Sequence, residues 1–309
     1  MESEAIKTKK RKSRGLTRLE KWAGKAQSRF HRWSGRAIGI VRGRVMQNRI
    51  DAYWWDDFIN FGDLITARLL EDFGFTPVHR PPGKARVIAV GSVLEHVPED
   101  YTGIIIGAGL IRAESLRRFP RAAVLALRGE LTRQRLRASE DTVLGDPGLL
   151  IARLMKERRE KTFVLGIVPH YTDCGNGRLR EILNRHPKEV CLIDPRRDPV
   201  KVVRDIDQCE FILSSSLHGL VCSDALGIPN AWLSLSDHLI GRGFKFRDYY
   251  SVLKKDPLPV LITGNESLPW LVGQTSRPTA SLIADTRDTL EQAFFRIKEM
   301  VSSTKRQAG

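Results

Sequence analysis

A run of three serines followed by a leucine and a histidine, from Ser214 to His218, contains the residues of this chain best suited to chemistry. An apolar run at residues 211–213 precedes it, and a helical pattern follows until Pro229. This order predicts a buried strand, a tight turn and a helix. Unpaired N–H groups at the start of a helix attract phosphate or carboxylate, and a histidine there can also move a proton. The alternative is that the serines only cap the helix and His218 is a satisfied, half-buried residue.

Alternation of strands and helices indicates an α/β fold made of two halves similar in kind. The predicted strands, each followed by polar or helical sequence, are residues 87–90, 104–106, 122–127, 163–168, 189–193, 210–213 and 231–235. We expect two Rossmann-like domains that face one another across a cleft, with ligands beyond the carboxyl ends of the strands. Arg128, His170 and His218 all fall at such strand ends or just after them.

Length and patterning divide the chain into four parts. At 309 residues it exceeds the usual size of a single core, so two domains are expected. We predict a basic arm at residues 1–50, domains at 51–160 and 161–280, and a C-terminal helix and tail at 281–309. This helix can cross back and pack on the first domain.

The net charge of +15 is concentrated in the arm. Residues 1–50 hold 15 Lys and Arg against 3 Asp and Glu, whereas the rest of the chain holds 36 against 33. After a disordered start through Arg14, apolar residues from Leu16 to Val45 recur at three- or four-residue steps among the basic ones. This pattern predicts a basic amphipathic helix on an anionic membrane surface, the alternatives being docking on the body or on a partner protein. The near-neutral body has no nucleic-acid motif, so nucleic acid is not expected as a partner.

Composition also limits the location of the protein. The chain has no run of 18 apolar residues and begins with charged rather than apolar sequence, so neither a membrane span nor a secretory signal is expected. Its four cysteines are spread out without a C-x-x-C pair, which suits a reducing compartment and argues against structural zinc. We therefore predict a cytoplasmic protein that can sit at the inner face of the plasma membrane.

Six short motifs occur in the order typical of the polysaccharide pyruvyl transferase family. They are Asn60-Phe61-Gly62-Asp63, Gly107-Ala108-Gly109, Arg128-Gly129-Glu130-Leu131-Thr132, Leu144-Gly145-Asp146-Pro147, the set Ser214, Leu217, His218, Gly219, Ala225, Gly227, Ile228 and Pro229, and Phe244-Lys245-Phe246-Arg247-Asp248-Tyr249-Tyr250. The chain resembles this family from about residue 51 to 255, and the last motif resembles its exopolysaccharide branch. Each motif is weak alone, whereas several in register are fairly specific. The resemblance implies two facing domains of the glycosyltransferase GT-B type.

The resemblance also implies a reaction. The donor would be phosphoenolpyruvate, and the acceptor a sugar with two free hydroxyls in a polysaccharide or lipid-linked repeat unit. The product would be a cyclic pyruvate ketal, with phosphate as the leaving group. Such a donor needs fixed cations and N–H donors around its carboxylate and phosphate.

Two cations are candidates for holding this donor. Arg128 can clamp it through a bidentate fork, and the alternative is an ion pair with Glu130 or Asp146. Lys245 lies between two phenylalanines that can keep it partly dry, and the alternative is a solvated surface lysine.

Proton transfer and anion binding fall to the serine–histidine segment. Ketal formation needs a proton delivered to the methylene carbon and protons removed from the hydroxyls, which a residue of near-neutral pKa can do. We assign this role to His218. The donor anion is assigned to the backbone and side chains of five residues of this turn and to a second histidine, namely Ser214, Ser215, Ser216, Leu217, Gly219 and His170.

The acceptor is assigned to three residues near the start of the body. Asn60 and Asp63 can bind hydroxyls, although Asx residues before a helix commonly cap it. Trp55, next to Trp54, can stack on a sugar face, although such pairs are more often packed in a core.

No metal and no cofactor are expected. One D-x-D occurs, at Asp205 and Asp207, but it enters a predicted strand rather than leaving it, so a solvated turn is the favoured interpretation. The Asp146-Pro147 pair is interpreted as a turn without chemistry. Two other functions stay open: a GT-B-type glycosyltransferase that uses a nucleotide sugar, and a non-catalytic protein that binds membrane surfaces.

Overall fold

The computed structural model describes residues 48–235, 241 and 243–307, with side chains through residue 301. The amphipathic helix predicted between Leu16 and Val45 lies outside these ranges. The first strand, β1 (Arg49–Tyr53), begins two residues before the predicted start of the body at residue 51.

The first half of the body is built on a six-stranded parallel sheet in the order β2-β1-β3-β4-β5-β6. Its strands after β1 are β2 (Thr76–His79), β3 (Val87–Ile88), β4 (Ile104–Ile106), β5 (Ala123–Leu127) and β6 (Val143–Leu144). The central strands are apolar and buried because helices and loops cover both faces of a parallel sheet.

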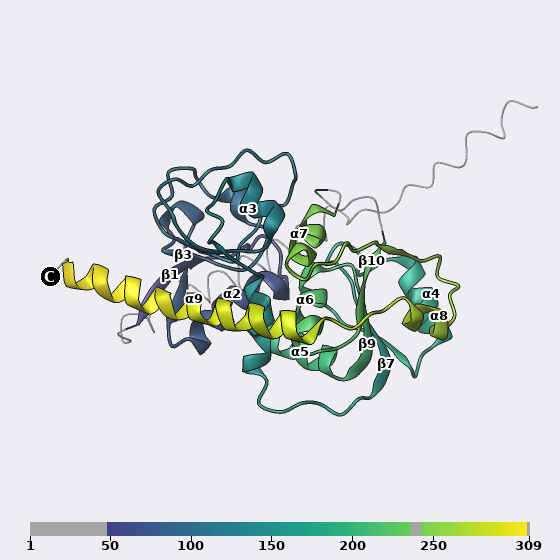
Figure 1. Cartoon of the computed structure of the whole chain (residues 1–309). Coiled ribbons are helices and arrows are strands. Elements are labelled where there is room, and N and C mark those ends of the chain that lie inside the picture. The colour runs from purple at the N-terminus through teal and green to yellow at the C-terminus, as the bar shows by residue number, and fades with distance from the viewer. Residues whose placement is uncertain (1–47, 236–240, 242, 308–309) are drawn as a thin grey trace, which may run out of the picture.

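The second half is built on a five-stranded sheet in the order β11-β10-β9-β7-β8, also parallel. Its strands are β7 (Phe163–Val168), β8 (Val190–Leu192), β9 (Cys209–Ser214), β10 (Asn230–Ser234) and β11 (Val260–Leu261). Two parallel sheets with helices around them agree with two Rossmann-like domains, as predicted (Figure 1).

The two sheets share one strand order. Counted from its first strand, each runs 2-1-3-4-5, with a sixth strand added in the first sheet. The order reverses between β1 and β3 in one sheet and between β7 and β9 in the other. Ligands of doubly wound sheets bind in the crevice outside the carboxyl ends of the strands at this reversal, the switch point. The fold therefore predicts a ligand crevice at each of the two switch points.

Helices connect the strands and fill the space between the halves. They are α2 (Phe61–Asp72), α3 (Glu130–Leu136), α4 (Gly177–Arg185), α5 (Pro199–Asp207), α6 (Leu217–Ala225), α7 (Phe244–Val252), α8 (Leu268–Gly273) and α9 (Ala280–Gln307), with 3₁₀ turns η1 (Pro82–Lys84), η2 (Leu94–His96) and η3 (Pro147–Leu154). One hydrophobic cluster runs without a break from Ile50 in β1 through Phe61 in α2 to Leu220 in α6. The two halves are thus joined by a shared core.

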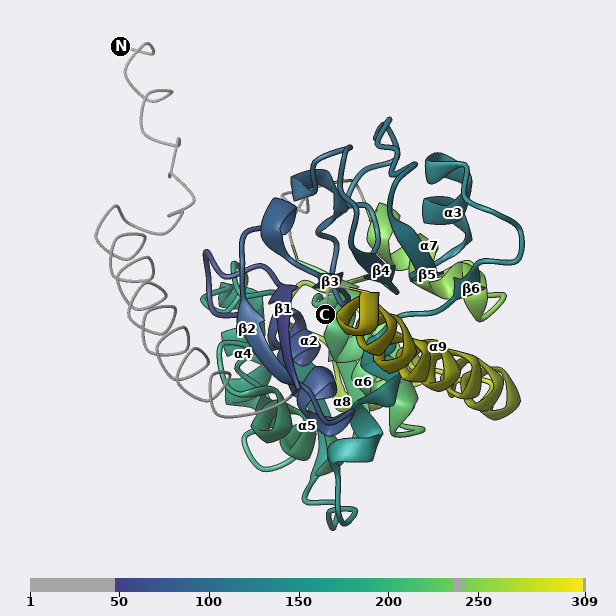
Figure 2. The same cartoon turned by 90° about the vertical axis from the view of Figure 1, so that its left-hand side faces the viewer.

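Two helices late in the chain pack on the first half. Phe244 of α7 lies in a cluster made otherwise of first-half residues. Phe294 of α9 stacks on Phe73 at a ring-centroid distance of 4.8 Å, and Leu290 is fully buried in the shared core. Figures 1 and 2 show α9 crossing from the second half to the first. The return of the terminal helix is therefore confirmed.

The D-x-D segment is not the solvated turn that was predicted. Asp205 and Asp207 lie in the last turn of α5, and Asp207 is fully buried. Arg158 Nε donates to Asp207 Oδ1 at 2.7 Å, while Asp205 pairs with Arg197. Both carboxylates therefore bind arginines at the amino end of β9, away from the switch point.

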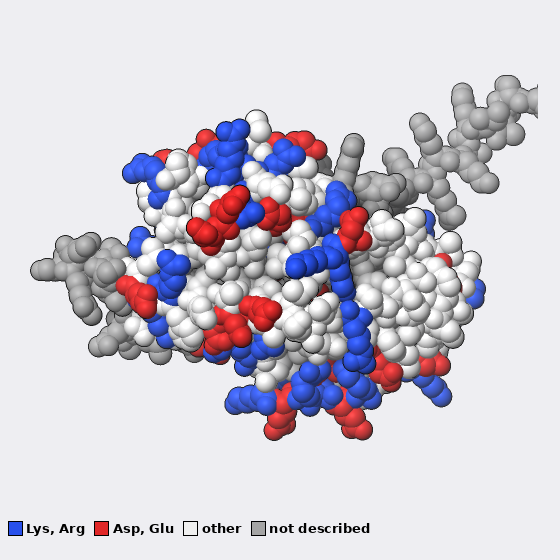
Figure 3. Space-filling view, in the orientation of Figure 1, with Lys and Arg blue, Asp and Glu red and all other residues white. Residues whose placement is uncertain are grey.

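Charge on the described surface is mixed. Charges of both signs cover the first half in the view of Figure 3, where a band of Lys and Arg borders a broad, almost uncharged face of the second half. Within the described ranges, no helix is both long enough and apolar enough to span a bilayer.

Candidate active site

The turn between β9 and α6 is built as the sequence predicted, with its serines used inside the protein. Ser214 Oγ donates to Val168 O at 2.8 Å and to Ser216 O at 2.7 Å. Ser215 Oγ donates to Asp173 Oδ2 at 3.0 Å. These bonds tie the turn to β7 and to the loop after it, so the serine hydroxyls shape the site.

Gly219 has a steric role in this turn. A Cβ at Gly219 would lie 2.2 Å from Ser214 Oγ, so only glycine lets α6 start this close to β9. The N–H of Gly219 donates to Ser216 O at 3.1 Å. The N–H groups of Leu217 and His218, by contrast, have no acceptor in the described part of the chain, as expected for the first turn of a helix. Of the predicted anion donors, these two amides are the ones free to bind.

His218 lies between the two halves. Its side chain is 7% exposed, and its Nε2 lies 3.5 Å from Oδ2 of the fully buried Asp146. Phe61 of α2 meets the imidazole edge-on, with ring centroids 6.5 Å apart. A Cβ at Gly62 would lie 2.0 Å from His218 Nδ1, so the start of α2 can pack on the ring only because residue 62 is glycine. The second switch point therefore places its histidine against the first.

Asp63 lies next to His218, in the first turn of α2. It is 8% exposed, and burial raises its pKa, with His218, Asn60 and Lys245 opposing the rise. Asn60 Nδ2 donates to Asp63 Oδ2 at 2.8 Å, which orients the carboxylate. Asn60 occupies the N-cap position of α2 without a side-chain capping bond, and Asp63 is inside the helix, so the capping alternative is wrong for both. Neither side chain caps the helix, and Asp63 lies where the charge of His218 acts on it.

Lys245 of α7 is partly buried, so the alternative that it is a solvated surface lysine is wrong. Its Nζ lies 5.3 Å from the centroid of the Phe246 ring, as the flanking aromatic residues suggested. Burial and the nearby charge of Arg128 lower the pKa of Lys245 to about 8, while Asp63 and Asp173 oppose this effect. The ammonium group thus lies within electrostatic range of Asp63, on which the charge of His218 also acts.

His170 follows β7 and faces the same cluster. Burial, together with the charge of Lys245, lowers the pKa of His170 to about 3, so the ring is neutral near pH 7. Its backbone N–H donates to Ser215 Oγ at 2.8 Å, and its Nδ1 lies 2.7 Å from Thr172 Oγ1. His170 is thus neutral and is tied to the turn between β9 and α6.

Arg128 is fully buried beneath this cluster. Its Nε donates to Asp248 Oδ2 at 2.8 Å, and its two terminal nitrogens donate to Ser92 Oγ and to Leu110 O. The partner is Asp248 of α7, so the alternatives of Glu130 and Asp146 are both wrong. All three nitrogens are engaged by the protein, and the predicted donor clamp stays a prediction.

Trp55 lies at the edge of the first-half core. Its ring packs against that of His96 with centroids 4.6 Å apart. The neighbouring Trp54 packs on His79. These contacts fit the packing alternative and leave the role of Trp55 in acceptor binding a prediction.

Two carboxylates of the site were not predicted. Asp146 was interpreted as part of a turn, although it stands in one of the motifs quoted above. Asp173 carries no sequence signal, and its place near Lys245 depends on the loop after β7. Neither role follows from spacing, because each depends on how the two halves meet.

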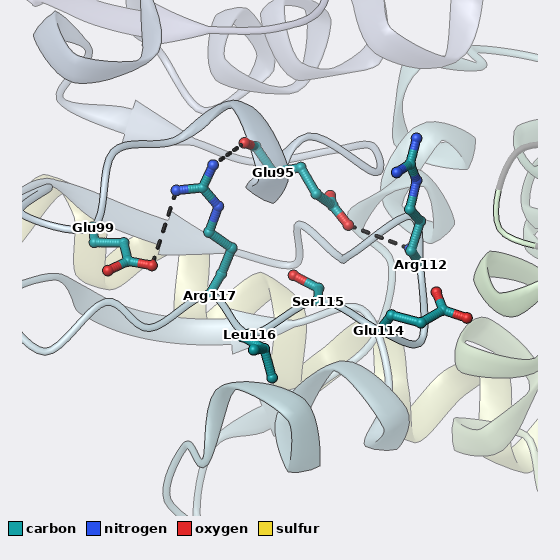
Figure 4. Close-up of a pocket in the computed structure, with 7 residues that line it drawn as sticks. All are labelled: Glu95, Glu99, Arg112, Glu114, Ser115, Leu116 and Arg117. Carbon is teal, nitrogen blue, oxygen red and sulfur yellow. Dashed lines mark hydrogen bonds and ion pairs between the residues drawn. The ribbon is translucent and has the colours of Figure 1, made fainter.

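A separate pocket of about 300 Å³ opens on the first half, on loops that follow β3 and β4 (Figure 4). Its lining residues are Glu95, Glu99, Arg112, Glu114, Ser115, Leu116 and Arg117. Arg117 reaches Glu99 at 4.0 Å, and Glu95 Oε1 accepts from Ile111 N at 2.8 Å. None of the predicted site residues lines this pocket. The described part of the chain also has no group of three or more His, Cys, Asp or Glu side chains arranged to hold a metal.

The geometry at the switch points agrees with a family match. The model of the polysaccharide pyruvyl transferase family matches residues 60–237, more than half of the chain. The chain belongs to the polysaccharide pyruvyl transferase family. The matched range begins at Asn60 and includes Asp63, Arg128, His170 and His218. It contains the carboxyl ends of β3, β7 and β9, whereas the end of β1 and Lys245 lie outside it.

Two curated relatives match parts of the chain. The succinoglycan biosynthesis protein ExoV of Rhizobium meliloti (strain 1021) is 26% identical over 212 residues, which is 65% of this chain and 64% of that protein. The uncharacterized protein L143 of Acanthamoeba polyphaga mimivirus is 33% identical over 159 residues, which is 48% of this chain and 54% of that protein. The chain thus spans less than two thirds of the length of either relative.

Proposed function

We propose that this chain transfers pyruvate from phosphoenolpyruvate to a sugar of a polysaccharide or lipid-linked repeat unit, forming a cyclic ketal. Family membership supports pyruvyl transfer, and the name of the Rhizobium relative supports a glycan acceptor. The observation on which the proposal rests most is the close packing of the start of α2 on the His218 ring, which sets Asp63 where the charges of both His218 and Lys245 act on it. An acid–base group, a cation and a carboxylate are the three functions that the reaction needs.

The donor is bound on the side of the second half. Lys245 and the free amides of Leu217 and His218 supply positive charge and N–H groups for its carboxylate and phosphate. His170 lines this crevice in its neutral form. Arg128 acts from beneath, because its bond to Asp248 holds the helix that carries Lys245.

The acceptor enters from the side of the first half. Asn60 orients Asp63, and Asp63 accepts a hydrogen bond from the first attacking hydroxyl. A carboxylate with a raised pKa is a stronger base than an ordinary aspartate. Trp55 lies close along the chain, where a sugar ring can pass over its exposed part.

His218 and Asp63 share the proton transfers of the proposed reaction. His218 gives a proton to the methylene carbon of the donor while the first hydroxyl adds to the adjacent carbon and loses its proton to Asp63. The second hydroxyl then adds to the same carbon as the bond to phosphate breaks, and phosphate leaves with the proton of that hydroxyl. A proton passing from Asp63 to His218 restores both groups, which their proximity allows.

The surrounding architecture is proposed to match this task. Two facing domains, at residues 51–160 and 161–280 in a GT-B-like arrangement, bring donor and acceptor together from opposite sides. The basic arm at residues 1–50 is proposed to hold the protein at the cytoplasmic membrane face, where lipid-linked sugars lie.

Phosphate release tests the reaction directly. The full chain is incubated with phosphoenolpyruvate, with and without a glycan acceptor that carries two free hydroxyls. Phosphate release that depends on the acceptor, with a mass gain on the glycan, is expected. Release of nucleoside diphosphate from a nucleotide sugar would favour a glycosyltransferase instead, and no turnover of either donor would favour a binding protein.

A further inference from the structure

The carboxylate of Asp146 has one oxygen in use and one without a partner. Asp146 follows β6 and caps η3, where its Oδ1 accepts from Gly148 N at 2.8 Å. The residue is fully buried. Its Oδ2 has no hydrogen-bond partner among the described residues. Because the cap fixes the carboxylate, Oδ2 has a set direction.

That oxygen faces the Nε2 atom of His218, which also lacks a hydrogen-bond partner among the described residues. His218 Nε2 is buried and lies 3.5 Å from Asp146 Oδ2. A buried polar atom left unpaired costs about 1–3 kcal/mol. An N–H···O bond of ordinary length needs the two atoms only a few tenths of an ångström closer. The simplest explanation of two unpaired atoms this close together is that Nε2 donates a hydrogen bond to Oδ2.

The packing around His218 holds the ring in this orientation. A Cβ at Gly148 would lie 3.7 Å from His218 Cδ2 and 2.9 Å from Val221 Cγ1, so η3 approaches α6 through a glycine. Phe61 meets the ring on another side. On the side of α2, Gly62 leaves Nδ1 without a covering side chain, and Asp63 is the charged group there. Nε2 thus faces Asp146, whereas Nδ1 lies on the α2 side of the ring, where the charge of Asp63 acts on His218.

We propose that Asp146 is a positioning residue that accepts Nε2–H of His218 and so directs Nδ1 toward the reacting groups. An ionised carboxylate that accepts from one ring nitrogen selects the tautomer and stabilises the imidazolium before it gives up its Nδ1 proton. The first half thereby controls an acid–base group carried by the second half. The catalytic part of this inference rests on the proposed function, whereas the tautomer does not.

The tautomer can be read without any substrate. We would label the histidines of the full chain with ¹⁵N, assign His218 by its loss in His218→Gln, and record the imidazole shifts of the neutral ring. The expected wild-type state has the proton on Nε2. A proton on Nδ1 in the wild type would overturn the proposal, whatever any variant does.

Variants then test Asp146 as the cause. Asp146→Asn keeps the cap of η3 and removes the charge, and Asp146→Ser keeps the cap without any group that reaches the ring. Both are expected to change the His218 shifts and, with phosphoenolpyruvate and acceptor, to lower kcat by roughly a thousandfold. Unchanged shifts in a folded variant would remove Asp146 from this role.

Asp224→Asn is the matched control. Asp224 is a buried carboxylate on the same helix as His218, but it accepts from Asn230 and Tyr249. This control is expected to leave the His218 shifts as in the wild type, and a matching change would assign the effect to general loss of buried charge. If no phosphate is released by the wild type, the proposed function fails while the tautomer result still stands.

Discussion

The two switch points share one strand order and differ in what they contribute. The first, at the ends of β1 and β3, supplies the carboxylate of Asp63 and close-packing glycines at positions 62 and 91. The second, at the ends of β7 and β9, supplies two histidines and the start of α6. One crevice thus offers negative charge and bare backbone, and the other offers imidazoles and N–H groups. A shared topology fixes where chemistry occurs and leaves its kind to a few residues.

Removing the imidazole from the second crevice should have the largest effect. His218→Ala is expected to lower turnover by roughly a hundredfold or more, because general acid–base catalysis is lost. Acceptor-dependent phosphate release measures it, with His186→Ala, at the end of α4, as the matched control. Equal turnover in His218→Ala and wild type would place the chemistry elsewhere.

Filling the gap between the crevices should have the next largest effect. In Gly62→Ala the new methyl would lie 2.0 Å from His218 Nδ1, so either the ring or α2 must move. We expect turnover to fall about tenfold or more and unfolding free energy to fall by about 1–3 kcal/mol. Gly177→Ala is the control, since a Cβ there meets nothing within 4 Å. Wild-type turnover and stability in Gly62→Ala would show that α2 is packed less tightly on the His218 ring than described.

Arg128→Lys distinguishes a structural role of Arg128, in holding α7 on the first half, from direct binding of the donor. A lysine cannot bond Asp248, Ser92 and Leu110 together, so the variant should lose about 3 kcal/mol of unfolding free energy. Thermal unfolding measures the stability, and calorimetry with phosphoenolpyruvate measures donor affinity. Arg133→Lys, which alters a half-exposed pair with Glu130 on α3, is the control. Weaker donor binding with unchanged stability would support the clamp.

The charge of Lys245 should appear in the pH dependence of donor binding. Its pKa is lowered to about 8, so the ammonium is present below that pH and is lost as pH rises through it. Donor affinity is expected to fall about tenfold between pH 7 and 9. Lys245→Arg should remove this decline because guanidinium stays charged. A decline of the same size in the variant would assign the titration to another group.

Deleting residues 1–47 should have the smallest effect on chemistry. The cut ends before β1, so the described body is kept whole. Turnover on a soluble acceptor is expected to stay within about twofold, while co-sedimentation with anionic liposomes is lost. Retained liposome binding would move the membrane contact to the body.

The parts of the fold that depend on local pattern were predictable from the sequence. The strands at residues 104–106 and 163–168 were placed to the residue, because apolar runs bounded by turn residues mark buried parallel strands. The strands β1, β2, β6 and β11 were missed. β1 begins inside the stretch assigned to the basic arm, and the other three have only two to four residues at sheet edges, which leave little pattern. The helix α7 was quoted as a motif but not as a helix.

The candidate site divides in the same way. His218 and Lys245 follow from residue type and local context. The pairing of Arg128 with Asp248 and the contact of His218 with Asp146 could not be predicted in this way. The first pair is 120 residues apart along the chain and the second is 72 apart, and each pair meets only through the packing of the two halves. A sequence pattern reports neighbours along the chain, and these contacts are neighbours in space.

The path of α9 makes the first half depend on the last stretch described. Leu290 and Phe294 complete the same apolar interior as β1 and α2. A chain cut before Ala280 would leave that interior open to water, although every strand of both sheets would still be present. Limited proteolysis in the segment before α9 should therefore destabilise the remote amino-terminal sheet first. A folding intermediate in which this helix is not yet docked should expose a hydrophobic surface to chaperones.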